Sequence, residues 1–283
     1  MTTSGFSAFT DTNEKEAPEA PIVNASIPVL AQQGYAETYE GAGEIGTASP
    51  RHPNGTIIIM HGYDPFCGPE PRARLGQLIA SLYDYYDRRG YAIFAPTYNS
   101  WKTFVDCATD MGNALVKGGW PIHRTHMIGY SMGGLVCRKM VAEKFVQPLS
   151  LSTLCTPHTG TAPWVPTPTP GAMSLSPGSA DIAWLNHNED ADRAIRDRYQ
   201  AIGVCYDDKS GKTHHDDQLI NGNSQLAQNL GFGKTPYFKF YEQRDANLLT
   251  IGGVHGDCQN WPFAGQLMRP LIEHIAAADA RFG

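Results

Sequence analysis

The 283-residue chain has little charge and no long apolar run. Charged residues make up 18% and apolar residues 41%, which is enough to bury a full core and too apolar for a disordered chain. The longest strongly apolar stretch is residues 57–60, far short of the roughly 20 residues that cross a bilayer. We therefore expect no integral membrane segment.

Basic clusters and a targeting signal are also missing. The chain has 22 Lys and Arg against 28 Asp and Glu, with no basic block, so we expect no nucleic-acid partner. The N-terminus has neither the basic nor the apolar region of a secretory signal. As given, the sequence predicts a cytoplasmic protein, or a secreted one if a signal was removed. Residues 1–20 are polar and acidic and are interpreted as a flexible arm before one domain at 21–283.

The six cysteines are spread along the chain, and no C-x-x-C pair occurs. This spacing argues against a cysteine-based zinc site, and six cysteines in 283 residues are too few for a disulfide scaffold. Cys137 and Cys155 lie in apolar runs and are predicted to be buried thiols. Pairing stays open among the other four, Cys67, Cys107, Cys205 and Cys258.

Strand and helix patterns alternate along most of the chain. Strands are expected at 56–60, 91–95, 126–129, 149–154 and 198–205, and helices at 71–89, 103–117, 131–145 and 265–278. Alternation of this kind predicts a mostly parallel, doubly wound sheet. Ligands bind such sheets beyond the carboxyl ends of the strands.

The sharpest motif is GYSMGG at 129–134, between an expected strand and an expected helix. It fits G-x-S-x-G, a sharp turn that lifts a serine hydroxyl above the sheet. The small residues two places before and after Ser131 are needed because larger ones would collide in so tight a turn. Ser131 is therefore the candidate nucleophile.

With three further segments, this motif resembles the α/β-hydrolase superfamily, and within it the bacterial lipases and esterases. The segments are IIIMHGY at 57–63, LCTPHTG at 154–160, and SPGS at 176–179 followed by WLN at 184–186. The resemblance covers about 55–275. It implies an α/β-hydrolase fold with a small cap insertion at about 161–198.

The resemblance also implies two backbone N–H donors for an oxyanion. One belongs to the residue after the nucleophile, Met132, and the other to Tyr63 in the loop after the first central strand. Gly62 lets the backbone turn close to the substrate. We interpret His61 as a residue that fixes this loop, because in this family the catalytic histidine comes last in the chain.

Ten histidines compete for the role of base, and the family order is serine, acid, histidine. His255 fits best, because it follows an apolar and glycine-rich segment and precedes the final helix. His274 lies inside that helix and is expected at the surface.

The acid is expected after the strand at 198–205, where the loop is rich in aspartate. The segment DQLI at 217–220, with Ser224 seven residues after Asp217, resembles the D-x-L-V…S of lipases. Asp217 is therefore the predicted acid, and Asp208 and Asp216 stay open as alternatives.

The cap region at 161–198 is apolar and rich in proline. Lipase-like enzymes roof the acyl pocket with such an insertion, so Trp164, Trp184 and Leu185 are predicted to bind substrate. The alternative is an insertion that packs on its own core.

No metal is required by this chemistry. The run HHDD at 214–217 is interpreted as a solvated loop. Asp257 stands where some bacterial lipases have one ligand of a structural calcium, but the second aspartate of that site has no match here. We predict no cofactor, with structural calcium left open.

The resulting hypothesis is a serine ester hydrolase, a lipase or esterase, acting on a small ester or acylglycerol through Ser131, Asp217 and His255. An acyltransferase, amidase or thioesterase would use the same triad. A non-catalytic binding protein on this fold is the third possibility, since fold does not imply function.

Overall fold

A computed structural model gives the structure of the chain. It describes residues 54–64, 82, 85–86, 89–96, 98–117, 124–162, 169–187, 193–227, 230, 237–244, 255–256 and 263–283. The expected arm at 1–20 lies outside the described residues.

The described strands form one sheet in the order β2-β1-β3-β4-β5-β6, with β7 paired to β5. Their bounds are β1 Gly55–Met60, β2 Tyr91–Phe94, β3 Thr125–Tyr130, β4 Ser150–Leu154, β5 Tyr199–Asp208, β6 Thr213–His214 and β7 Tyr237–Arg244. All pairings are parallel except that of β5 with β6. The chain goes from β1 to β2 on one side and returns to β3 on the other, so a topological switch point lies between β1 and β3.

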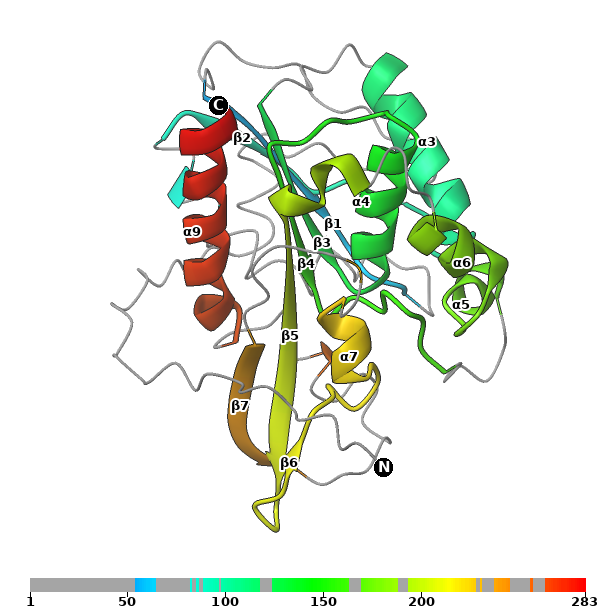
Figure 1. The fold of residues 1–283 in the computed structure, drawn as a ribbon, viewed down its shortest axis with the longest axis vertical. Helices are drawn as coiled ribbons and strands as arrows, with labels where there is room; N and C mark the ends of the chain where they lie inside the picture. The colour runs from blue at the N-terminus through cyan, green and yellow to red at the C-terminus, as the bar shows by residue number, and fades with distance from the viewer. Residues whose placement is uncertain are drawn as a thin grey trace, which may run out of the picture.

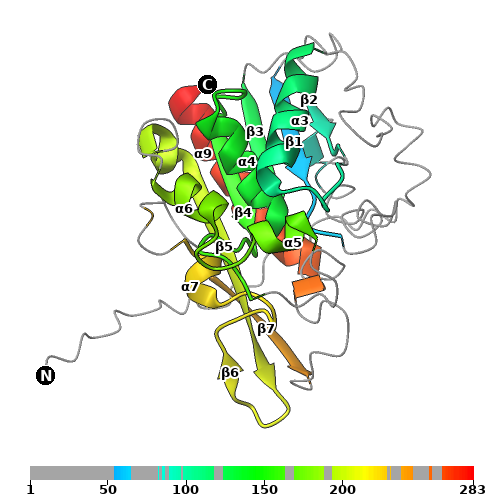
Figure 2. The same cartoon turned by 90° about the vertical axis from the view of Figure 1, so that its right-hand side faces the viewer.

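Helices cover both faces of the sheet (Figures 1 and 2). Their bounds are α3 Phe104–Lys117, α4 Met132–Ala142, α5 Pro170–Ser174, α6 Ala180–His187, the 3-10 helix η1 Arg193–Arg198, α7 Gly222–Gln225 and α9 Phe263–Phe282. In Figure 1, α9 lies on one side of the sheet and α3, α4 and α6 lie on the other. The predicted α/β class is therefore confirmed, including the mostly parallel sheet.

Two hydrophobic clusters follow from the alternation of side chains along each strand. Ile57 and Ile59 of β1 pack in the cluster that contains Leu271 of α9. Ile58 and Met60 face the opposite way, into the cluster of α3 and α4. Because both faces of this central strand are buried, its residues 57–60 are an uninterrupted run of apolar residues.

The expected strands all occur, with small differences at their ends. β5 continues to Asp208, beyond the expected end at 205, because its second half pairs with β7 rather than β4. Of the helix expected at 71–89, the described residues Leu82, Tyr85 and Tyr86 are helical, whereas Arg89 already lies in the turn with Gly90, which has φ 70°. The strand β7 was missed, although its sequence YFKFYEQR is rich in aromatic residues.

α4 stops at Ala142 rather than the expected 145, because Lys144 adopts a positive φ of 63°. α9 runs from Phe263 to Phe282, longer at both ends than expected. His274 on this helix is not at the surface as predicted. It is half-buried, and its Nε2 lies 2.9 Å from the carbonyl oxygen of Arg198.

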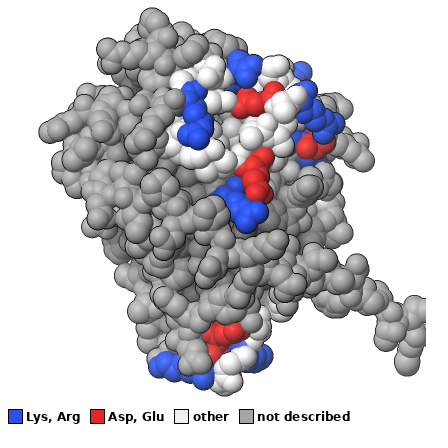
Figure 3. All heavy atoms as spheres, turned by 90° about the vertical axis from the view of Figure 1, so that its left-hand side faces the viewer, with Lys and Arg blue, Asp and Glu red and all other residues white. Residues whose placement is uncertain are grey.

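Two ion pairs lie at the surface of α9, one within the helix and one to η1. Arg269 pairs with Glu273 at 2.8 Å, and Arg281 pairs with Asp197 at 3.2 Å. Figure 3 shows this side of the molecule, where basic and acidic side chains lie interspersed. In the part of the chain that the structure describes, no helix has both the length and the apolar character needed to cross a bilayer.

The β1 core generates a stability prediction. Ile59 is fully buried in the strand that leads to the loop at 61–64, whereas Val116 on α3 is 62% exposed. Replacing Ile59 by alanine should lower the free energy of unfolding by about 2–5 kcal/mol, because it leaves a cavity. The control Val116→Ala should change it by no more than about 0.5 kcal/mol. Equal midpoints for the two variants in urea denaturation would contradict this packing.

Candidate active site

Ser131 forms a strained turn at the carboxyl end of β3. β3 ends at Tyr130 and α4 begins at Met132, so Ser131 alone makes the reversal. Its φ of 53° and ψ of −125° are rare for a residue with a side chain. The Ser131 N–H donates to the carbonyl of Leu154 at the end of β4, at 2.8 Å. The strand-turn-helix context expected for G-x-S-x-G is present.

The glycines around Ser131 leave no room for a side chain. A Cβ on Gly129 would lie 2.5 Å from the Cα of Gly134. A Cβ on Gly133 would lie 2.3 Å from the carbonyl oxygen of Met60, and one on Gly134 would lie 2.1 Å from Thr156 Oγ1. The steric reason inferred from the sequence for these small residues is confirmed.

His255 lies against Ser131. Its Nε2 is 2.9 Å from Ser131 Oγ, and its Nδ1 is 2.6 Å from Asp217 Oδ2. The backbone holds it as well: its N–H donates to the Asp217 carbonyl at 2.9 Å, and its carbonyl accepts from the Tyr130 hydroxyl. Tyr130, the variable residue before the serine, was not identified from the sequence as a support for the histidine.

Asp217 is fully buried, and both of its carboxylate oxygens are engaged. Oδ2 faces His255, while Oδ1 accepts from the N–H groups of Leu219 and Ile220 at 3.0 and 2.6 Å. These backbone donors fix the orientation of the carboxylate. With His255 Nδ1 carrying a proton toward Asp217, Nε2 is left to accept one from Ser131.

The other two candidate aspartates, Asp208 and Asp216, form hydrogen bonds with other groups. Asp208 closes the β5–β6 hairpin: Oδ1 accepts from Ser210 and Lys212, and Oδ2 lies 2.9 Å from His214 Nε2. The Ser210 hydroxyl and then His214 lower the pKa of Asp208 well below its usual range. Asp216 Oδ1 accepts from the N–H of Gln218 at 2.8 Å. Among the three candidates, the structure brings Asp217 to His255.

The loop after β1 is fixed by His61, as the sequence indicated. His61 Nε2 accepts from the Tyr98 N–H at 3.1 Å, so its Nδ1 carries the proton and donates to the Gly62 carbonyl at 2.6 Å. The Tyr98 ring stacks on His61, and its hydroxyl donates to the His61 carbonyl. A Cβ on Gly62 would lie 2.9 Å from Ser131 Cβ, so this loop passes directly against the serine.

Two residues that follow Tyr98 hold the far end of the same loop. The Asp64 N–H donates to Ser100 Oγ at 2.8 Å, and Trp101 Nε1 donates to the Asp64 carbonyl at 2.9 Å. Tyr63, which precedes Asp64 in this loop, has its hydroxyl oxygen 2.9 Å from Thr169 Oγ1. Sequence reasoning missed Tyr98, Ser100 and Trp101 as supports. The available signal was their position just beyond the carboxyl end of a parallel strand.

Of the expected cap, α5 contacts the Tyr63 loop and α6 packs against α4. Thr169, the N-cap of α5, bonds to Tyr63. On α6, Trp184 lies under Lys139, whose Nζ is 3.2 Å from the ring centroid, and Leu185 is fully buried in the core. Lys139 is eight residues beyond Ser131 on α4, or about 12 Å along a helix. A role of Trp184 and Leu185 in substrate binding stays a prediction, and Trp164 lies outside the described residues.

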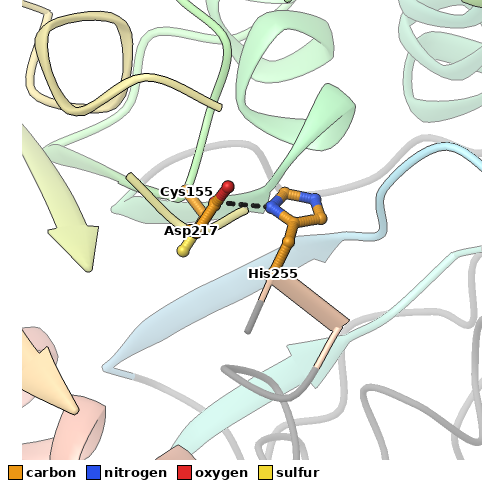
Figure 4. A group of neighbouring side chains, drawn as sticks. All are labelled: Cys155, Asp217 and His255. Carbon is orange, nitrogen blue, oxygen red and sulfur yellow. Dashed lines mark hydrogen bonds and ion pairs between the residues drawn. The ribbon is translucent and has the colours of Figure 1, made fainter. Parts of the chain in front are cut away.

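Cys155 is the unexpected neighbour of the Asp217–His255 pair (Figure 4). It is a buried thiol, as expected, and so is Cys137. One ligand atom from each of Cys155, Asp217 and His255 lies within 4.8 Å of the others. Asp257, the position considered for calcium, lies outside the described residues.

The structure answers part of the pairing question that the sequence left open for the other four cysteines. Cys107 and Cys205 are thiols, so they do not pair with each other. Cys67 and Cys258 lie outside the described residues.

Below the site, a buried histidine joins α4 to the loop after β4. Arg138 Nη1 donates to His158 Nδ1 at 3.3 Å, so His158 Nε2 carries the proton and donates to Thr153 Oγ1 at 2.9 Å. Asn186 connects both: its amide donates to the His158 carbonyl, and its oxygen accepts from Arg138. Burial, and then the Arg138 charge, hold the pKa of His158 well below its usual range.

This depressed pKa predicts a loss of stability in acid. Below the pKa of about 6.5 of an unfolded-chain histidine, His158 takes a proton only when the protein unfolds. The free energy of unfolding should therefore fall as pH drops from 7 toward 5, by up to about 1.4 kcal/mol per unit from this group. In urea denaturation at several pH values, His158→Gln should show a shallower fall than the wild type. Parallel curves for the two proteins would contradict the assignment.

Comparison with known proteins adds evidence on the fold alone. No protein-family model and no curated protein sequence matches this chain. Among solved structures, a metagenome-derived lipolytic enzyme, LipS or LipT, aligns with a TM-score of 0.50 at 13% identity, covering 84% of this chain and 99% of its own.

Two further structures are less similar. A metagenomic carboxyl esterase has a TM-score of 0.49 at 9% identity, covering 82% of this chain and 77% of its own. Esterase B from Lactobacillus rhamnosis has a TM-score of 0.46 at 14% identity, covering 82% and 78%. The strand order, the turn at Ser131 and the likeness to the lipolytic enzyme agree: this chain has the α/β-hydrolase fold.

Proposed function

We propose that this protein is a serine hydrolase that cleaves carboxylic esters through an acyl-enzyme. The observation that carries the proposal is the unbroken path from Ser131 Oγ to His255 Nε2 at 2.9 Å, and from His255 Nδ1 to Asp217 Oδ2 at 2.6 Å. Both distances are within hydrogen-bond reach, which is the geometry needed to activate a serine. The substrate we propose is a small ester or acylglycerol.

In the proposed acylation step, His255 Nε2 takes the hydroxyl proton as Ser131 Oγ attacks the ester carbonyl carbon. Asp217 orients the imidazole and stabilises the imidazolium that forms. When the tetrahedral intermediate collapses, His255 gives this proton to the departing alkoxide, which leaves as the alcohol. The acyl group is then an ester of Ser131.

The proposed oxyanion donors are the backbone N–H groups of Met132 and Tyr63. Met132 is the first residue of α4, so its N–H has no acceptor within the helix and lies at the positive end of the helix dipole. Tyr63 belongs to the loop that passes against Ser131. His61 and Trp101 hold that loop from both sides, which supports a preorganised donor.

Deacylation repeats the same chemistry with water. His255 takes a proton from water, the hydroxide attacks the acyl carbonyl, and Ser131 is released with the proton returned to its oxygen. These steps use only the triad and backbone amides, so we propose that turnover needs no cofactor.

The first test is Ser131→Ala on a series of nitrophenyl esters from acetate to palmitate. We expect kcat to fall by about 10³-fold or more on every ester that the wild type cleaves, because no other group supplies the nucleophile. Ser210→Ala, in the hairpin that Asp208 closes, is the matched control and should keep wild-type activity. A folded Ser131→Ala that retained a tenth of the wild-type rate would refute the proposed nucleophile.

Product analysis in the same assay separates the related activities. With a competing alcohol or amine present, hydrolysis gives the free acid, and an acyltransferase gives the new ester or amide instead. If the new ester or amide is the main product, the protein is an acyltransferase. The proposed roles of the three triad residues would then stay the same.

The second test compares three aspartates. Asp217→Asn should lower kcat by up to roughly 10⁴-fold, because asparagine favours the wrong imidazole tautomer and does not stabilise the imidazolium. Asp208→Asn and Asp216→Asn should stay near the wild-type rate, since their carboxylates bond within the hairpin and its neighbouring turn. The three values of kcat are measured on one short-chain ester, with folding checked by circular dichroism. A large loss of kcat in Asp208→Asn, together with a near wild-type kcat in Asp217→Asn, would overturn the assignment of the acid.

A further inference from the structure

Cys155, Asp217 and His255 together have the composition of a zinc site. A thiol, a carboxylate and an imidazole are the three side-chain groups that bind Zn²⁺ in proteins. Here one ligand atom of each lies within 4.8 Å of the others, and all three residues are buried (Figure 4). We propose that these residues form an inhibitory site for Zn²⁺ and similar soft divalent cations.

The backbone brings Cys155 to this position. It follows the last residue of β4, its N–H donates to the Ile202 carbonyl of β5 at 2.9 Å, and its φ is 47°. Asp217 lies between β6 and α7, and His255 follows β7 in the chain. Zn–S bonds of about 2.3 Å and Zn–N or Zn–O bonds of about 2.0–2.2 Å require ligand atoms roughly 3–4 Å apart. A separation of at most 4.8 Å therefore needs only small side-chain movements.

The charges of this cluster also suit a divalent cation. A Cys155 thiolate and the Asp217 carboxylate supply two negative charges, and neutral His255 supplies none. Bound Zn²⁺ therefore leaves the buried group without net charge, which avoids the cost of burying an unbalanced ion.

Binding would stop the proposed reaction through the imidazole. The cation takes the lone pair of His255 Nδ1, so the proton that Nδ1 carried moves to Nε2, and the Cys155 thiol proton goes to solvent. His255 stays neutral, but its Nε2 then carries a proton and accepts none from Ser131. Zinc also replaces the Asp217–His255 hydrogen bond that orients the ring. This inhibitory effect rests on the proposed function, whereas the binding itself does not.

Of the three proposed ligands, His255 is the most exposed. His255 and Ser131 are each 6% exposed, while Cys155 and Asp217 lie deeper, at 1% and 0%. Inhibition should therefore be measured after preincubation with the metal. Within the described part of the chain, no second trio of His, Cys, Asp or Glu has this spacing.

The test compares Cys155→Ala and Cys155→Ser with the wild type and with the control Cys107→Ala. Cys107 is a buried thiol on α3, bonded to the Asn99 carbonyl. Wild type and Cys107→Ala should lose ester hydrolysis in Zn²⁺ and regain it in EDTA. Both Cys155 variants should hydrolyse the ester without metal, and the Zn²⁺ concentration for half-inhibition should rise by roughly tenfold or more, because one ligand is gone.

Cd²⁺ titration gives a readout that is independent of activity. Wild type and Cys107→Ala should show a thiolate-to-cadmium charge-transfer band that saturates near one equivalent, and both Cys155 variants should lose it. A band that depends on Cys155 in a protein without hydrolysis would support the metal site and refute the proposed function. Equal inhibition and equal bands in wild type and both variants would overturn the metal site, and so would an active wild type with no band.

Discussion

The turn at Ser131 is the constraint on which the rest of the site depends. A residue with a side chain at φ 53° and ψ −125° costs about 1–3 kcal/mol, so its surroundings must hold it there. The Ser131 N–H extends the sheet ladder to Leu154, and the glycines on either side let α4 start directly against β1. The hydroxyl therefore stands at the carboxyl end of β3, where the loop after β1, the segment after β6 and His255 also meet.

Parallel strand order explains how residues far apart in sequence meet at this edge. The loop after β1 lies beside Ser131, the segment between β6 and α7 carries Asp217, and His255 follows β7. Each arrives with its own backbone support: Tyr98 and Trp101 hold the first loop, and Ile220 orients Asp217. The chemistry that we propose needs the reacting atoms positioned to within tenths of an ångström. The contacts that hold the backbone therefore matter as much as the identity of the side chains.

Local patterns predicted the elements well, because short apolar runs and glycine turns are properties of neighbouring residues. The serine and the histidine followed from motifs and chain order. The acid was harder, since Asp208 at the end of β5 and Asp217 just after β6 are both near the carboxyl end of β5, and only the hairpin contacts of Asp208 with Ser210 and His214 separate them. The positions of Trp184 and Cys155 were not predictable. Each is set by tertiary contacts, with Lys139 of α4 in one case and with residues after β5 and β7 in the other.

The central claim is that Ser131 is activated by His255 and Asp217 as one unit. The most direct measurement is labelling of the native protein with a fluorophosphonate, followed by peptide mapping, because the reagent forms a stable bond with an activated serine hydroxyl. The account predicts one label per chain on the peptide that contains Ser131, and none on the protein unfolded in urea. A native protein that stays unlabelled, or one labelled at a different serine, would contradict it.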